Sequence, residues 1–152
     1  MSYGHWSLYC APLSFRNAKG GLAVAEHVHH RAAKAWLDAA QDDTVAFCRV
    51  TQMGFLRLLC NPRAMAEDVL TPARAWRALD AFCVDSRILI AAEPPGLEAS
   101  WRALTTPRAP GANFWTDAYL AAFASAAGHT LITFDKGFRR FDKLRLRLLV
   151  GS

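Results

Sequence analysis

The chain has 152 residues, of which 53% are hydrophobic and 20% charged, so a disordered chain is excluded and one folded domain is expected. No apolar stretch approaches the roughly 18 residues of a membrane-spanning helix, and the first residues lack a secretory signal, which predicts a cytoplasmic protein with no membrane contact. The net charge of +5, with 14 arginines among 18 basic residues, indicates contact with nucleic acid, unless a GC-rich genome alone explains the arginines.

Helical and strand-like segments alternate in the first half of the chain. Residues 27–40 have helical periodicity, and residues 44–50 form a short apolar run that predicts a buried strand. A helix with an N-cap at its first residue is expected over residues 51–60, because the Asn-Pro pair that follows stops a helix. The Thr-Pro pair at residues 71–72 starts another helix. The residues of this helix expected to face inward are Ala75, Trp76, Leu79, Phe82 and Cys83.

The second half continues the alternation. Residues 87–92 predict a second strand, which is followed by a short helix. A helix over residues 116–127 then leads into a strand at 130–134, and residues 144–150 alternate in the manner of a final edge strand. Strands that alternate with helices indicate an α/β domain with a mainly parallel sheet.

Two aspartates interrupt the apolar stretch "WTDAYLAAFASAAGHTLITFDKGF". Asp117 stands at the start of the predicted helix, and Asp135 stands at the end of the strand that follows. Because that helix runs antiparallel to the strands, both acids are expected at the carboxyl edge of the sheet, where open α/β sheets bind ligands. Each acid alone also fits helix-start or turn chemistry. Two acids in one cleft repel unless a cation lies between them, so the pair predicts a Mg²⁺ site suited to phosphodiester cleavage.

A basic segment, "KGFRRFDKLRLR", follows Asp135 directly and covers residues 136–147. It contains six of the chain's 18 basic residues, interleaved with aromatic and apolar side chains. A guide for the RNA backbone and an ordinary solvated face are both compatible with this pattern.

Packing, rather than chemistry, is the expected role of the histidines, tryptophans and cysteines considered next. His27 and His30 lie one helical turn apart but have no third ligand at suitable spacing, so partly packed imidazoles are expected rather than a metal site. The five tryptophans are expected mainly in core or interface packing rather than against bases. The cysteines form no CxxC pair or zinc-finger spacing, so buried free thiols are expected. They are Cys10, Cys48, Cys60 and Cys83.

The segment "WTDAYLAAFASAAGHTLITFDKGFRRF" resembles the carboxy-terminal half of a PIN domain, of the kind found in VapC toxins of bacterial toxin–antitoxin pairs. Upstream, "EHVHHRAAKAWL", "CRVTQMGFLRLLCNP" and "EPPGLEASWRAL" resemble one VapC subgroup, so the likeness extends over about residues 22–149. The resemblance implies a PIN-like three-layer α/β/α fold and an endoribonuclease that depends on Mg²⁺ or Mn²⁺. It also implies an RNA substrate, a tight-binding VapB-like antitoxin and a homodimer.

The resemblance assigns expected roles to individual residues. Asp117 and Asp135 match the family's two carboxy-terminal metal-binding aspartates, so they are the expected catalytic and metal-binding residues. Thr133 matches a hydroxyl position and should face the same side of its strand as Asp135. Thr51 and Arg57 match features of the VapC subgroup, and Arg57 either contacts phosphate or covers apolar surface. The basic segment, rather than the resemblance, gives the residues expected to contact RNA, which are Lys136, Arg139 and Arg140.

The start of the chain departs from the PIN pattern. PIN domains usually open with a hydrophobic strand that carries an aspartate, whereas residues 1–25 contain no acid at all. Residues 1–21 are therefore expected to be an atypical, irregular segment, and residues 22–152 a PIN-like domain whose first strand is aberrant or missing. Residues 6–15 either fill the central slot of the sheet or leave it open, and Pro12 argues against a clean strand there.

Two functions remain open after these departures. The first is a VapC-like, metal-dependent endoribonuclease whose activity is impaired by loss of the first-strand aspartate. The second is a catalytically degenerate PIN module that binds RNA or an antitoxin without cleaving. Two carboxylates hold a divalent ion less well than three or four, and no acid occurs in residues 51–60 either.

Overall fold

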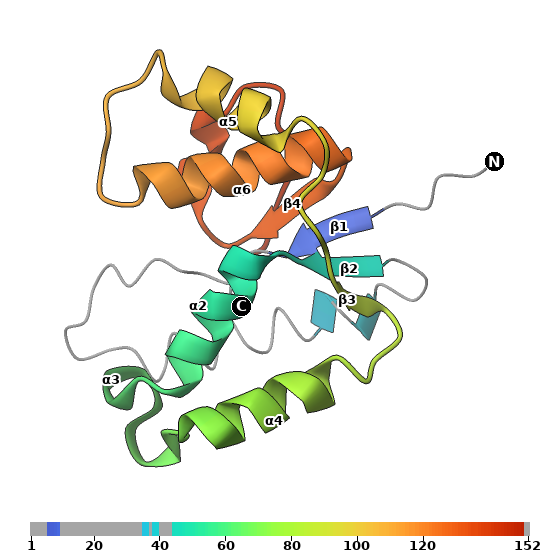
Figure 1. Ribbon diagram of the computed structural model, residues 1–152, viewed down its shortest axis with the longest axis vertical. Helices are drawn as coiled ribbons and strands as arrows, with labels where there is room; N and C mark the ends of the chain where they lie inside the picture. The colour runs from blue at the N-terminus through green and yellow to red at the C-terminus, as the bar shows by residue number, and fades with distance from the viewer. Residues whose placement is uncertain (1–5, 10–34, 37, 40–43, 151–152) are drawn as a thin grey trace.

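The structure is a computed structural model that describes residues 6–9, 35–36, 38–39 and 44–150 (Figure 1). Within these residues the sheet has five strands, in the spatial order β3-β2-β1-β4-β5. Each pair of neighbouring strands is parallel, as the alternation of strands and helices predicts. The strands are β1 (Trp6–Tyr9), β2 (Thr44–Phe47), β3 (Ile88–Ile90), β4 (Thr130–Thr133) and β5 (Leu146–Leu148).

From β2 onward, helical segments connect successive strands, close to where the sequence predicts them. The β5 strand lies at one edge of the sheet, which confirms the predicted edge strand. The helical segments are α2 (Arg49–Leu59), α3 (Pro62–Met65), η1 (Ala66–Asp68), α4 (Pro72–Phe82), α5 (Leu97–Thr105), α6 (Phe114–Ala127) and η2 (Lys136–Arg140).

The helix that follows β2 begins earlier than expected. The apolar run at residues 44–50 predicts a strand throughout, but β2 ends at Phe47 and Cys48 is the N-cap of α2. The Thr51 hydroxyl donates a hydrogen bond to the Cys48 carbonyl at 2.8 Å, inside the first helical turn. The predicted N-cap at Thr51 is therefore wrong, because a short apolar run fits a buried helix start as well as a strand.

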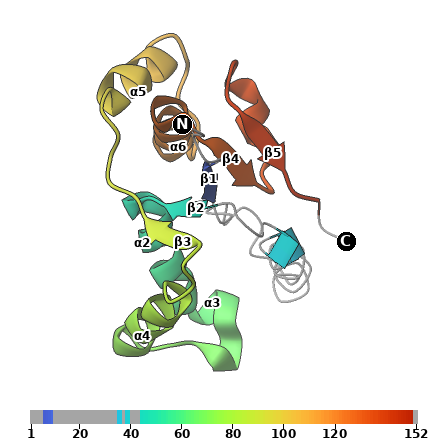
Figure 2. The same cartoon turned by 90° about the vertical axis from the view of Figure 1, so that its right-hand side faces the viewer.

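Different helices cover the two faces of the sheet, so the fold is the three-layer α/β/α arrangement that the sequence predicts (Figure 2). On one face, Ala46 of β2 and Leu131 of β4 belong to a buried cluster with α5 and α6. On the other face, Val45 and Ile132 pack with Trp36 and with the end of α4. Successive residues of one strand thus face opposite layers, as strand geometry requires.

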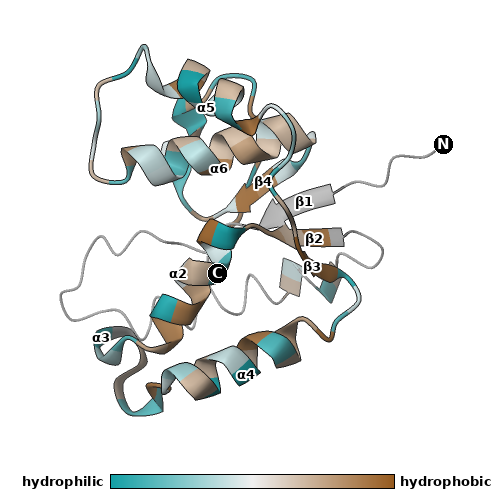
Figure 3. Ribbon diagram, viewed as in Figure 1, coloured by the Kyte–Doolittle hydropathy of each residue, from teal (hydrophilic) through white to brown (hydrophobic). Residues whose placement is uncertain are grey.

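Helix α6 is buried between the sheet and α5. Its alanines without any exposed surface are Ala118, Ala121, Ala122 and Ala124. Such small side chains let the helix approach both neighbours closely. Gly128, with a φ of +68°, ends α6 and turns the chain into β4. The ribbon of α6 is pale to brown over most of its length, whereas α4 alternates between brown and teal (Figure 3).

The central slot of the sheet is occupied by β1. The strand pairs with β2 through Leu8 opposite Ala46, and with β4 through Leu8 opposite Leu131. The expectation that the first 21 residues are irregular is therefore wrong for residues 6–9, and the slot is filled rather than open. Pro12, which argues against a strand, lies outside the described residues, and β1 covers Trp6–Tyr9. The predicted domain boundary at residue 22 itself stays a prediction.

One face prediction for α4 needs correction. Ala75 and Leu79 are buried as expected, and Phe82 and Cys83 are half-buried. Trp76, however, is 48% exposed. Position 76 lies 100° around the helix from position 75, at the border of the stripe that faces the core, so its large ring remains largely in solvent.

The described cysteines are free thiols, as predicted, but they are not equally buried. Cys48 is completely buried, whereas Cys60 and Cys83 are partly exposed, so the prediction of full burial is wrong for those two. Cys10, His27 and His30 lie outside the described residues. In the part of the chain that the structure describes, no helix has both the length and the apolar composition to cross a bilayer.

A proline in β1 tests whether this strand serves as the centre of the sheet. Leu8→Pro removes a ladder donor between two paired strands and leaves an acceptor without its partner, so it should lower the free energy of unfolding by about 1–3 kcal/mol, measured by thermal denaturation. Val150→Pro is the control, since Val150 lies beyond β5 and is 80% exposed. Equal effects of the two substitutions, or fast hydrogen exchange at residues 7–9 beside slow exchange at 45–47, would contradict the assignment.

Candidate active site

Asp117 lies in the first turn of α6. Its backbone N–H donates to the Asn113 carbonyl at 2.9 Å, which closes the helix start, and its side chain is 15% exposed. The Arg140 guanidinium donates to Asp117 Oδ2 at 2.6 Å and forms an ion pair with it. The carboxylate is thus largely enclosed and is neutralised by a cation from the segment that follows β4.

Asp135 lies directly after β4 and is the N-cap of η2. Its Oδ1 accepts a hydrogen bond from the Gly137 backbone N–H at 2.7 Å. Its own backbone N–H donates to Thr133 Oγ1 at 3.1 Å, and Thr133 is completely buried at the end of β4. A Cβ at position 137 would lie 2.9 Å from Asp135 Oδ1, so the glycine leaves the space that this carboxylate occupies.

The two aspartates meet the geometric expectation for a shared edge. Helix α6 runs back from the carboxyl edge, so Asp117 at its start and Asp135 at the end of β4 lie at the same side of the molecule (Figure 1). The Arg140 bond to Asp117 joins the segment that Asp135 begins to the start of α6. Within the described residues no group of three His, Cys, Asp or Glu side chains is arranged to hold a metal ion. The metal-binding and catalytic roles of the two aspartates therefore stay predictions.

The basic residues predicted to contact RNA lie on η2, next to Asp135. Lys136 and Arg139 are exposed, and the Arg140 side chain is 43% exposed despite its ion pair. The neighbouring Phe141 ring is buried, and the Arg140 guanidinium carbon lies 4.9 Å from its centre. Arg108 is not among the residues that the sequence predicts for this site, yet its guanidinium carbon lies 5.4 Å from the centre of the same ring. No local pattern marks Arg108, because the contact joins two segments that are distant in the sequence.

The two residues carried over from the VapC subgroup lie on α2. Thr51 is 1% exposed, and its hydroxyl bonds within the helix to Cys48. Arg57 is exposed in the last turn, where α2 has run away from β2 and the sheet (Figure 1). Thr51 therefore lies close to the carboxyl end of β2, whereas Arg57 lies at the far end of the helix.

A further acid, Glu93, follows β3 at the same carboxyl edge. The Tyr119 hydroxyl of α6 donates to Glu93 Oε1 at 2.8 Å. Burial, together with this bond, raises the pKa of Tyr119, so the hydroxyl remains a donor at neutral pH. The sequence contains the signal for Glu93, since this acid follows an apolar strand-like run just as Asp135 does.

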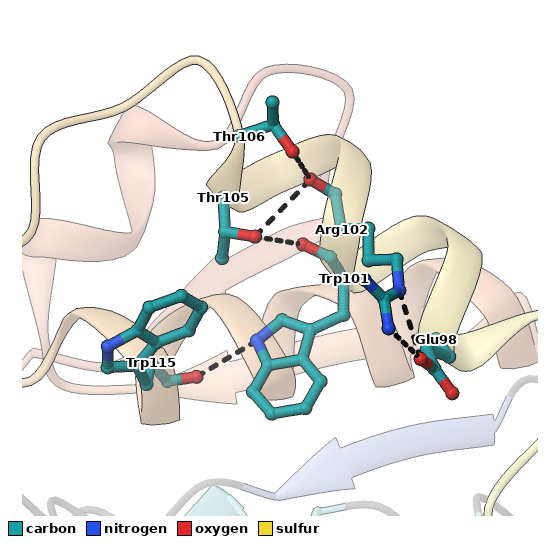
Figure 4. A pocket seen from close by; sticks show the side chains of 6 residues that line it. All are labelled: Glu98, Trp101, Arg102, Thr105, Thr106 and Trp115. Atoms are coloured by element: carbon teal, nitrogen blue, oxygen red, sulfur yellow. Dashed lines mark hydrogen bonds and ion pairs between the residues drawn. The ribbon is translucent and has the colours of Figure 1, made fainter.

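A shallow cavity of about 340 Å³ lies between α5 and the first turn of α6 (Figure 4). Trp101 Nε1 donates to the Trp115 carbonyl at 3.2 Å, and the two indole rings meet edge to face with centres 6.1 Å apart. Trp101 is half-buried, whereas Trp115 is 60% exposed, so Trp115 is not a core residue and its packing at an interface stays a prediction. An exposed indole can stack on a base or bury against a protein partner.

The fold and the residues at the carboxyl edge of the sheet define the class of protein. It is an α/β/α domain with a parallel sheet, acids at the carboxyl edge and arginines beside them. The family model of the PIN domain matches residues 22–144. Ribonuclease VapC41 of Mycobacterium tuberculosis is 47% identical over 133 residues, covering 84% of this chain and 91% of that protein. VapC ribonuclease Mb2897 of Mycobacterium bovis is 30% identical, covering 82% of this chain and 83% of that protein. The chain therefore belongs to the PIN domain family and, within it, to the VapC group.

Two solved structures share the fold at low sequence identity. VapBC2 from Rickettsia felis, crystallised with a DNA fragment from its promoter, superposes with a TM-score of 0.62 at 19% identity, covering 94% of this chain and 99% of that one. VapBC-1 from nontypeable Haemophilus influenzae gives a TM-score of 0.57 at 13% identity, covering 93% and 97%. Both support the three-layer architecture.

Substitution of Gly137 separates the position of the Asp135 carboxylate from the stability of the fold. Gly137→Ala places a Cβ against Asp135 Oδ1, so the carboxylate must turn, whereas Gly137 does not have the left-handed backbone that would strain an alanine. We expect Mn²⁺ affinity, measured calorimetrically, to fall about tenfold, with less than about 1 kcal/mol lost from the free energy of unfolding. Gly111→Ala is the matched control, since nothing lies within 4 Å of a Cβ there. Equal Mn²⁺ affinities for the two variants would argue against Asp135 as a ligand.

Proposed function

We propose that this chain is a VapC-type toxin, an endoribonuclease that cleaves RNA phosphodiester bonds with the help of Mg²⁺ or Mn²⁺ in the cytoplasm. The 47% identity with a protein named ribonuclease VapC41, over most of both chains, supports the reaction class. The observation that carries the site is the pair of aspartates from α6 and β4 at one edge of the sheet, with basic residues beside them.

The donor set fits a hard divalent ion held by few protein ligands. Mg²⁺ commonly binds one or two carboxylates and keeps several waters, so Asp117 and Asp135 would suffice as its protein ligands. When bound, such an ion lowers the pKa of a coordinated water and offsets charge at the phosphate. Thr133 fixes the backbone of Asp135 through its hydroxyl, and Gly137 orients the carboxylate. Lys136, Arg139 and Arg140 supply positive charge for the RNA backbone.

The alternative function is a degenerate PIN module that binds RNA or an antitoxin without cleaving. Two observations favour it: Arg140 already pairs with Asp117, and the described residues contain no cluster of three possible metal ligands. The acid-free first 25 residues point in the same direction. The two functions differ in one measurable property, which is metal-dependent turnover.

Purified protein incubated with RNA and Mg²⁺ or Mn²⁺ should cleave the RNA. Asp117→Asn and Asp135→Asn should each reduce the rate by at least about a hundredfold, because each removes a charged ligand where the metal stabilises the transition state. Asp142→Asn, which changes an exposed acid just after η2, should leave the rate unchanged. Cleavage that persists in the double aspartate variant would refute the assigned roles. A wild-type chain that binds RNA but never cleaves it would establish the degenerate alternative.

We also propose a VapB-like antitoxin as the protein partner and a homodimer as the assembly of the toxin. The two solved neighbours are VapBC proteins, which supports the choice of partner. The described surface offers large exposed apolar side chains for such contacts, among them Met53 on α2 and Trp76 on α4, at 51% and 48% exposure. The helices that carry these two side chains, α2 and α4, pack against each other.

Co-expression with the small open reading frame beside this gene should yield a complex on size-exclusion chromatography. Trp76→Gln should weaken the complex by about tenfold or more, because exposed aromatic side chains commonly dominate the energy of protein interfaces. Val84→Gln serves as the control, since Val84 is another exposed apolar residue, at 81%, just beyond α4. A chain that elutes alone as a folded monomer would refute both partner proposals.

A further inference from the structure

Two arginines from distant segments share one aromatic ring beside the candidate site. The Phe141 ring is 3% exposed and packs against the buried ring of Phe138. The Arg140 guanidinium carbon lies 4.9 Å from the centre of the Phe141 ring, and the Arg108 guanidinium carbon lies 5.4 Å from it. Both distances are within the range of cation–π attraction. The ring thus holds two positive charges near each other.

Arg108 is fixed in place by backbone carbonyls. Its Nη1 donates to the Leu104 carbonyl at 2.8 Å, which belongs to the last turns of α5. Its Nη2 donates to the Arg140 carbonyl at 3.1 Å, across 32 residues of sequence. The half-buried side chain therefore bridges the α5–α6 loop to η2, and its guanidinium has little freedom.

Both guanidiniums retain donors for a ligand. An arginine has five N–H donors, of which Arg108 uses two on carbonyls and Arg140 uses one on Asp117. Carbonyls and an aromatic ring do not neutralise a guanidinium, and among the described residues no acid forms an ion pair with Arg108. Within the part of the chain that the structure describes, the acid paired with Arg140 is Asp117, the residue proposed to bind metal. A held pair of guanidiniums with spare donors is suited to a phosphate group, which it can bind through forked hydrogen bonds.

We infer that Arg108 and Arg140, with Phe141 as their shared platform, bind backbone phosphate of the RNA next to the scissile bond. The inference rests on the proposed ribonuclease function and adds Arg108, from the α5–α6 loop, to the RNA-binding residues. Arg140 belongs to this phosphate site and also pairs with Asp117, so the site adjoins the proposed metal ligands. Phosphate contacts of this kind position the strand and carry no base preference.

A purely structural role of Arg108 makes different predictions. If Arg108 only joined the α5–α6 loop to η2, its removal would lower the melting temperature without changing how RNA binding depends on salt. If it binds phosphate, its removal must reduce the number of counterions that RNA binding releases. The two roles therefore separate in a binding titration at several salt concentrations.

The test measures binding of a short single-stranded RNA with 2′-O-methyl groups, which cannot be cleaved, by fluorescence anisotropy in EDTA. Arg108→Ala should weaken binding about tenfold and reduce the slope of log affinity against log salt by about 0.7, the value for one lost phosphate contact on a single strand. Arg108→Lys should retain the slope but bind more weakly than wild type. Arg77→Ala, an exposed arginine on α4, is the control for loss of one charge.

Each outcome is decisive. Unchanged affinity and slope in Arg108→Ala, with wild-type RNA binding and cleavage intact, would overturn the inference and leave the proposed function standing. A lower melting temperature with an unchanged slope assigns Arg108 a structural role, and loss of antitoxin binding alone assigns it to the protein interface; both refute the inference. A wild-type chain that binds no RNA refutes the inference and the proposed function together.

Discussion

The burial of α6 is the constraint on which the rest of the structure depends. Its fully buried alanines bring the helix against the sheet on one side and against α5 on the other. Because the helix is fixed along its length, its first turn holds Asp117 at the carboxyl edge, and its left-handed end at Gly128 delivers the chain into β4. The same element thereby sets the position of Asp135 at the far end of that strand. A close-packed core, rather than a loop, determines the geometry of the site.

The ion pair between Arg140 and Asp117 gives the edge its electrostatic character. An aspartate with 15% exposure is costly to leave charged without a partner, and Arg140 supplies that partner at 2.6 Å. The guanidinium in turn lies on the Phe141 ring, which connects it to Arg108. The Asp117 carboxylate and the Arg140 guanidinium thus stabilise each other. A divalent ion would have to compete with Arg140 for the same carboxylate oxygen.

Much of this arrangement follows from the sequence. Apolar periodicity predicts the order of strands and helices. Because a connecting helix runs antiparallel to the strands, the sequence also predicts that Asp117 and Asp135 lie at the same edge of the sheet. Glu93 follows β3 as Asp135 follows β4, so the same sequence pattern predicts it as a further acid at this edge. Arg108 could not be predicted from the sequence, because its hydrogen bond to the Arg140 carbonyl joins residues 32 apart and leaves no local pattern. The start of the chain does not follow from the sequence: Pro12 and the missing acid argue against a strand, whereas four residues, Trp6–Tyr9, suffice to fill the central slot.

The central claim is that Asp117 and Asp135 hold one divalent ion together, although the first strand brings no acid. A double-mutant cycle on Mn²⁺ affinity, measured by calorimetric titration, tests it most directly. If both carboxylates bind the same ion, Asp117→Asn and Asp135→Asn should each remove most of the affinity, and the double variant should be little worse than either single variant. Strictly additive losses, or a wild-type chain that binds no Mn²⁺, would contradict the account.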